Sequence, residues 1–168
     1  MSRQEKTPLE TAVGILMKQA LSRQLLRRKL HDKGFSWKAA EEAVSDCERY
    51  GYINDRLVAE TKVSIMRDRG DGARKIRLNL RLKGFEKEVI DEAFKTDEKM
   101  SERDELSIAL DVLRRKKISL DRESDPVKKK LKALRTLASK GFSSGVSYQA
   151  LNRFFGDPEN SFDEESCQ

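Results

Sequence analysis

The sequence is poor in proline and glycine, which interrupt helices, and in cysteine and histidine, which often act as catalytic residues or metal ligands. Its 168 residues include three prolines, nine glycines, two cysteines and one histidine. So few prolines and glycines favour helical structure. His31, Cys47 and Cys167 lack partners at metal-ligand spacing, and the chain has no P-loop, HExxH or dinucleotide-binding glycine motif. We therefore expect no catalytic residue, no metal and no cofactor, and we predict a protein that is not an enzyme.

Long apolar runs are also missing. No run approaches the roughly 20 residues that a membrane-spanning helix needs. The first ten residues, MSRQEKTPLE, contain no apolar signal-peptide core. We therefore expect a cytoplasmic protein without membrane association, and we expect a monomer.

Charge is abundant and unevenly distributed. Charged residues make up 38% of the chain and hydrophobic residues 37%, which allows only a thin core. Residues 157–168 contain five acids and no base, so the first 156 residues carry 35 bases against 24 acids. A basic body with a short acidic tail favours a polyanionic partner, although the same excess can simply keep a surface soluble.

One pattern occurs three times, around Lys33, Lys83 and Lys140. Apolar residues recur three residues before each lysine and two, six, ten and eleven residues after it. These residues are Leu30, Phe35, Ala39, Ala43 and Val44; Leu80, Phe85, Val89, Ala93 and Phe94; and Leu137, Phe142, Val146, Ala150 and Leu151. The last three spacings follow one face of a helix. Each copy therefore predicts a helix, a turn with a left-handed glycine, and a second helix.

A further apolar pattern precedes each copy and predicts a first helix, over residues 8–20, 55–69 and 103–117. Ser36 and Ser143 are suitable N-caps for helices, and Asn54 or Asp55 is expected to cap the second of these first helices. The predicted fold class is all-α, with three tandem three-helix units in a curved, elongated array. The units are expected at 1–50, 51–98 and 99–156, followed by an acidic, disordered tail at 157–168.

Basic residues form three clusters, two of which lie in equivalent places on the second helix of their units. Because the clusters recur from unit to unit, we predict a strip that follows a polymer, either a nucleic acid backbone or a protein filament. For a single cluster, a solvated helix face is the simpler interpretation. The candidate partner-binding residues are Arg23, Arg27, Arg28, Arg74, Lys75, Arg77, Arg81, Lys128, Lys129, Lys132 and Arg135.

Three segments in order, RRKLHDKGF, YGYINDRLVAE and GDGARKIRLNLRLKGF, resemble the RecX family of bacterial regulators of the RecA recombinase. The resemblance covers residues 9–155, and its most specific part is Gly51, Tyr52, Ile53, Asp55 and Ala59. We predict structural roles there, with Gly51 ending a helix and Asp55 capping the next. The chain departs from the family at Leu25, where a glutamate is frequent, and in the turn at Asp71 and Ala73.

The resemblance implies tandem three-helix units that lie in the groove of the RecA–DNA filament and modulate its activity, usually by inhibition. Such inhibition requires binding alone. If the turn around Asp71 touches the partner, its negative charge would alter the affinity.

Two other interpretations remain open. A helix, glycine turn and helix with basic residues resembles a DNA-binding helix-turn-helix, although the helices that follow the first two turns are acidic. A helical-repeat scaffold for a protein partner outside recombination is equally compatible with the repeat geometry.

Overall fold

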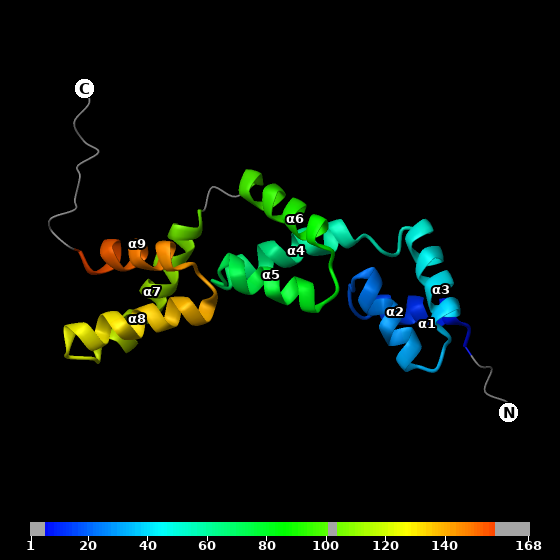
Figure 1. Ribbon diagram of the computed structural model, residues 1–168, viewed down its shortest axis with the longest axis horizontal. Helices are drawn as coiled ribbons and strands as arrows, with labels where there is room; N and C mark the ends of the chain where they lie inside the picture. The colour runs from blue at the N-terminus through cyan, green and yellow to red at the C-terminus, as the bar shows by residue number, and fades with distance from the viewer. Residues whose placement is uncertain (1–5, 101–103, 157–168) are drawn as a thin grey trace, which may run out of the picture. The chain divides into compact units, whose positions relative to one another are not determined.

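The computed structural model describes residues 6–100 and 104–156, and within them the chain forms nine helices and no strand (Figure 1). In chain order the helices are α1 (Pro8–Leu16), α2 (Arg23–Asp32), α3 (Trp37–Arg49), α4 (Asp55–Asp68), α5 (Ala73–Leu82), α6 (Lys87–Met100), α7 (Glu105–Asp121), α8 (Pro126–Lys140) and α9 (Ser144–Phe155). The predicted all-α class is confirmed. The acidic segment 157–168, including Cys167, lies outside the described residues.

The chain forms two compact units, whose boundaries cross two helices. The first unit takes its described residues from Met1–Ser64 and Arg77–Met100, and the second from Ile65–Ile76 and Ser101–Gln168. Of the three boundaries along the chain, one therefore falls within α4 and one within α5. The division into units at 1–50, 51–98 and 99–156 stays a prediction.

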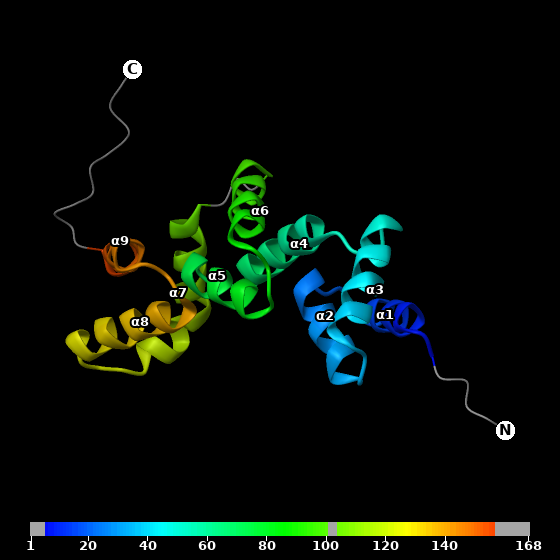
Figure 2. The ribbon, with the colours of Figure 1, turned by 45° about the vertical axis from the view of Figure 1, so that its right-hand side comes forward.

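Within the first unit, α1, α2 and α3 pack against one another around a small apolar core (Figure 2). Leu26, Leu30, Val44 and Cys47 are fully buried there. Cys47 is therefore a core residue, and its burial raises the pKa of the thiol. In the second unit, α7, α8 and α9 enclose a similar core with Leu113, Leu137 and Phe142.

The three predicted glycine turns are all present. Gly34, Gly84 and Gly141 have φ values of +97°, +80° and +85°. After each glycine, the N–H of the phenylalanine donates to the carbonyl of the leucine five residues before it, as in Phe35 to Leu30 at 3.3 Å. This bond closes the helix with the Schellman geometry that a left-handed glycine permits. The side-chain oxygens of Ser36 and Ser143 cap the helices that follow, as predicted.

Two first helices end elsewhere than the apolar pattern suggests. Helix α1 stops at Leu16, because Ser22 already caps α2 and the chain must turn between them. Helix α7 starts after Asp104, whose side chain accepts from Ser107 N–H, and continues to Asp121 with Leu120 buried.

The start of α2 is held by the start of α4 and the end of α5. Arg23 N–H donates to Asp55 Oδ1 at 2.9 Å, and Ser22 Oγ donates to the carbonyl of Lys83 at 2.5 Å. Asp55 therefore accepts from the first residue of α2, which Ser22 caps, and the prediction that Asp55 caps its own helix is wrong. Asn54 fills that role, since its Oδ1 accepts from Leu57 N–H at 3.0 Å.

The same junction recurs at the start of α5, with parts from α7 and α8. Ala73 N–H donates to Glu105 Oε1 at 3.0 Å, and Gly72 N–H donates to the carbonyl of Lys140 at 2.8 Å. Arg74 N–H donates to the carbonyl of Gly141 at 3.2 Å. In both junctions a helix start, with its unpaired N–H groups, meets an acid and the last carbonyls of another helix.

Asp55 should make stability depend on pH. Its half-buried position raises the pKa of its carboxyl, although the Arg23 N–H opposes this. The folded protein therefore holds the proton more tightly than the unfolded chain, and this group's contribution to the free energy of unfolding falls as pH rises from about 4 towards the raised pKa. We expect Asp55→Asn, which keeps an acceptor for Arg23, to reduce that fall.

Urea unfolding between pH 4 and pH 7 measures the effect. Asp55→Ala is the companion variant: it removes both the acceptor and the titrating carboxyl, and should cost about 1 kcal/mol at pH 4 and less as the pH rises. An Asp55→Asn protein with the same pH dependence as the unchanged chain would contradict the prediction.

Candidate functional site

Among the cations predicted to form a strip, some form ion pairs with acids and are called braced below, and others are exposed without an ion pair within the described residues. The first group pairs with acids of neighbouring helices. Arg27 Nη1 lies 2.9 Å from Glu41 Oε2, and Arg77 forms an ion pair with Asp91. Arg27 and Arg77 occupy the same repeat position, six residues before Lys33 and Lys83. Their acids also match, since each lies 14 residues after its arginine.

Both guanidinium groups also lie over an aromatic ring. The distance to the ring centroid is 5.4 Å from Arg27 to Trp37 and 4.2 Å from Arg77 to Phe94. The hydrogen bond from Arg77 lowers the pKa of Asp91. The arginine that recurs in the sequence therefore links the two helices on either side of its glycine turn, with an ion pair and a cation–π contact.

Arg23 is braced as well. Its guanidinium contacts Glu41 at 2.6 Å and Glu48 at 2.8 Å, and the hydrogen bond to Glu41 raises the pKa of Arg23. Hydrogen bonds from Arg23 and Arg27 in turn lower the pKa of Glu41. These cations contribute little uncompensated charge to a partner.

Asp71 points inward rather than toward a partner. Its side chain is 9% exposed and accepts from Lys75 Nζ at 2.8 Å and Lys140 Nζ at 3.2 Å. Burial would raise the pKa of Asp71, but these two hydrogen bonds bring it below its ordinary value. The negative charge in this turn is therefore structural, and it occupies Lys75 of the predicted strip.

Four of the predicted arginines form no ion pair within the described residues, and all four are exposed: Arg28, Arg74, Arg81 and Arg135. An exposed, unpaired guanidinium can donate several hydrogen bonds to a phosphate or carboxylate without losing an internal partner. These four are the strongest candidates for contact with an anionic partner.

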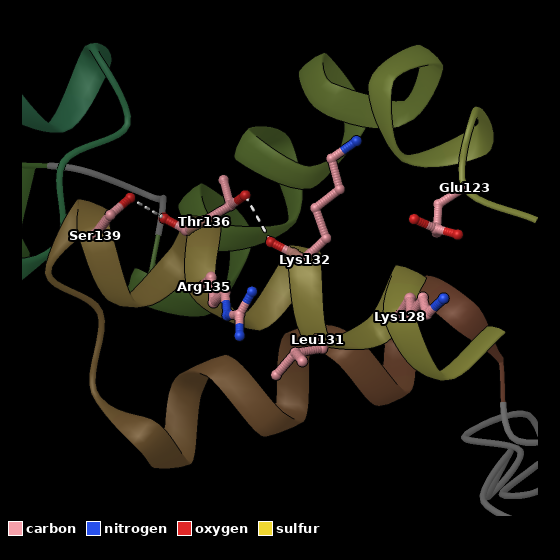
Figure 3. Close-up of a pocket in the computed structure, with 7 residues that line it drawn as sticks. All are labelled: Glu123, Lys128, Leu131, Lys132, Arg135, Thr136 and Ser139. Carbon is pink, nitrogen blue, oxygen red and sulfur yellow. Dashed lines mark hydrogen bonds between the residues drawn. The ribbon is translucent and has the colours of Figure 1, made fainter. Parts of the chain in front are cut away.

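Helix α8 carries the remaining candidates beside a hollow of about 470 Å³ (Figure 3). Its lining includes Lys128, Leu131, Lys132 and Arg135 from α8 and Glu123 from the preceding turn. In Figure 3 the side chains of Leu131 and Arg135 extend from one side of the helix and that of Lys132 from the other.

The lysines of α8 are partly engaged. Lys132 Nζ donates to the carbonyl of Ser119 at 2.5 Å, and Lys129 pairs with Asp121 at 2.6 Å. Lys128 lies 3.9 Å from Asp125. Arg135 is thus the cation of this hollow that is best placed to bind an anion.

Sequence reasoning missed the acids that neutralise the braced cations. A signal was present, because Glu41 and Asp91 sit eight residues after Lys33 and Lys83, in matching repeat positions. An acid that repeats in step with a cation indicates an internal pair rather than a binding strip.

The described helices hold neither a metal site nor a membrane span. Within residues 6–100 and 104–156, no three His, Cys, Asp or Glu side chains are grouped closely enough to hold a metal ion. None of the helices in this part of the chain is both long and apolar enough to cross a bilayer.

Comparison with known proteins gives a consistent result. The family model described as RecX, third three-helix domain, matches residues 103–151. Regulatory protein RecX of Haemophilus influenzae (strain PittEE) is 32% identical over 133 residues, which cover 79% of this chain and 84% of that protein. Its counterpart in Pasteurella multocida (strain Pm70) is 33% identical over 141 residues, 83% of each chain.

The clostridial relative is longer. Regulatory protein RecX of Clostridium beijerinckii is 31% identical over 146 residues, which cover 86% of this chain and 66% of that protein. Among solved structures, the crystal structure of RecX from Lactobacillus salivarius superposes with a TM-score of 0.75 at 19% identity, over 88% of this chain and 94% of that one. This likeness concerns the fold. The relatives are named as regulatory proteins, and at these identities and coverages the chain belongs to the RecX family.

Proposed function

We propose that this protein binds the RecA recombinase assembled on DNA and lowers its activity in recombination and DNA repair. Membership of the RecX family is the observation that carries the proposal. The protein acts as a monomer in the cytoplasm and needs no cofactor, because binding alone can prevent protomer addition or oppose a conformational change of the filament.

The exposed arginines support a role beside DNA. A filament presents phosphates next to protein, and Arg28, Arg74, Arg81 and Arg135 are free to meet them. Contacts of this kind release counterions and strengthen binding most at low salt.

The test is ATP hydrolysis by the cognate RecA on single-stranded DNA while this protein is titrated in. We expect inhibition well below one molecule per RecA, unchanged by excess single-stranded DNA. Substoichiometric inhibition of that kind means action on the filament, for example at its growing end. The absence of any effect on hydrolysis would contradict the proposal.

Direct binding to DNA is the second candidate, and the same unpaired arginines favour it. In that case excess single-stranded DNA would abolish the inhibition, because it would capture the protein. A fluorescently labelled oligonucleotide would then bind with an affinity that falls steeply with salt.

A further inference from the structure

Nothing among residues 6–100 and 104–156 covers the glycine turn of the first repeat, Lys33–Gly34–Phe35. A Cβ atom added to Gly34 would meet no other atom within 4 Å, and Lys33, Gly34 and the neighbouring His31 and Asp32 are exposed. The backbone here matches the turns at Gly84 and Gly141, with a positive φ and the same hydrogen bond from the phenylalanine N–H.

The two matching turns are both covered, and by the same kind of structure. A Cβ added to Gly84 would lie 3.0 Å from Cβ of Gln24, in the first turn of α2. A Cβ added to Gly141 would lie 2.6 Å from the backbone nitrogen of Lys75, in the first turn of α5. In each case the start of a helix rests directly on the glycine.

Hydrogen bonds to helix-end carbonyls hold both contacts. The carbonyl of Lys83 accepts from Ser22 Oγ, and that of Lys140 accepts from Gly72 N–H. The equivalent carbonyl at Lys33 has no such donor within the described residues. This turn therefore offers an unused acceptor and a glycine surface that fits close to a helix start.

A second copy of this chain does not supply the missing helix start. The helix equivalent to α2 and α5 in the last repeat is α8, which begins with Pro126 and so lacks an N–H where Arg23 and Ala73 donate. Asp125 already accepts from the N–H groups of Val127 and Lys128. The donors that would dock are therefore absent or occupied.

We propose that the Lys33–Phe35 turn receives the first turn of a helix from the protein partner, in the way that Gly84 receives α2 and Gly141 receives α5. This proposal rests on the proposed function, in which that partner is RecA. A hollow of about 320 Å³ beside the turn is lined by Lys18, Lys29, Lys33 and Asp32, among others. Its lysines favour a helix that carries acids in its first turn.

Gly34→Asn is the variant that tests the turn. Asparagine tolerates the left-handed backbone but adds a side chain where the incoming helix must rest. Gly51→Asn is the matched control, because Gly51 has a φ of +76°, lies in the same unit and is also free of atoms within 4 Å of an added Cβ. We measure binding of each protein to RecA filaments on single-stranded DNA by biolayer interferometry, after checking helicity by circular dichroism.

We expect Gly34→Asn to bind at least about tenfold more weakly, while Gly51→Asn binds like the unchanged protein. Equal binding by all three would overturn this inference and leave the proposed function intact. No binding by the unchanged protein would remove the proposed function, and the inference with it.

A photo-crosslinking residue at position 33 gives a second readout that does not depend on how Gly34→Asn folds. We expect an adduct with the first turn of a RecA helix, identified by mass spectrometry. Adducts only with other parts of RecA, or none from filaments that bind the protein, would overturn the inference.

Discussion

Gly141→Ala is expected to lower the free energy of unfolding by about 4 kcal/mol, and Gly34→Ala by about 1 kcal/mol. Both variants place a Cβ on a left-handed backbone, which costs about 1 kcal/mol. Only at Gly141 does the new atom also meet other backbone: it would lie 2.5 Å from Cβ and 2.6 Å from the nitrogen of Lys75. Relieving that overlap must move α5 away from the end of α8, which weakens the junction around Gly72.

Gly84→Ala should fall between the two. Its Cβ would lie 2.5 Å from Oε1 of Gln24, which can rotate away, but also 3.0 Å from Cβ of Gln24, which cannot. The expected loss is about 2 kcal/mol. The three variants thus separate the cost of the left-handed backbone from the cost of forcing two closely packed helices apart.

Urea unfolding followed by circular dichroism measures these losses, and all three variants carry the same substitution at equivalent repeat positions. Because the chain has two compact units, which can unfold in separate transitions, the unfolding transition of each unit is fitted separately. Equal losses at all three glycines would mean that the junctions contribute nothing beyond the turn itself, and would contradict the structure of both junctions.

Much of the local structure follows from the sequence alone. The spacing of Leu30, Phe35 and Val44 predicts two helices around a turn, because each helix has one apolar face. The turn contains a glycine, which adopts the left-handed backbone conformation without a steric penalty. The serine caps follow from the same reasoning, since Ser36 and Ser143 precede helices whose first N–H groups need acceptors. These features depend on residues close together in the chain.

The sequence was less informative where a side chain has its partner on another helix. Asp55 looks like a cap for the helix in which it lies, but it accepts from Arg23, 32 residues away. Asp71 looks like an acid in an exposed turn, but two lysines surround it, one of them 69 residues away. Periodicity identifies the face of a helix on which a charge lies and does not identify what packs against that face.

The predicted basic strip is another case in which the sequence does not show which charges have partners on other helices. Replacing the four exposed arginines, Arg28, Arg74, Arg81 and Arg135, with alanine is expected to weaken binding to single-stranded DNA or to RecA filaments by about tenfold to a hundredfold at low salt. The slope of log affinity against log salt should also become shallower, by about 0.7 for each phosphate that is no longer bound. Helicity should not change, because these side chains form no ion pair within the described residues.

The matched control replaces four braced cations, Arg23, Arg27, Lys75 and Arg77, with alanine, which removes the same formal charge. Here the expected change is in stability, by about 1–3 kcal/mol in total, because pairs that are 36–44% exposed on the cationic side are each worth little. Binding is measured by fluorescence anisotropy from about 50 to 200 mM salt, a range over which phosphate-binding proteins lose much of their affinity. Stability is measured by urea unfolding.

The comparison between the two quadruple variants distinguishes a binding surface from a general excess of positive charge. If only net charge mattered, both variants would lose affinity equally and their salt slopes would fall together. If the exposed arginines contact phosphates, only their removal makes the dependence of log affinity on log salt shallower. Arg27 and Arg77 contribute little to that dependence, because Glu41 and Asp91 already neutralise them. The arginines that repeat together with an acid, Arg27 and Arg77, therefore form contacts within their repeats, and the exposed arginines that form no ion pair within the described residues remain available to a partner.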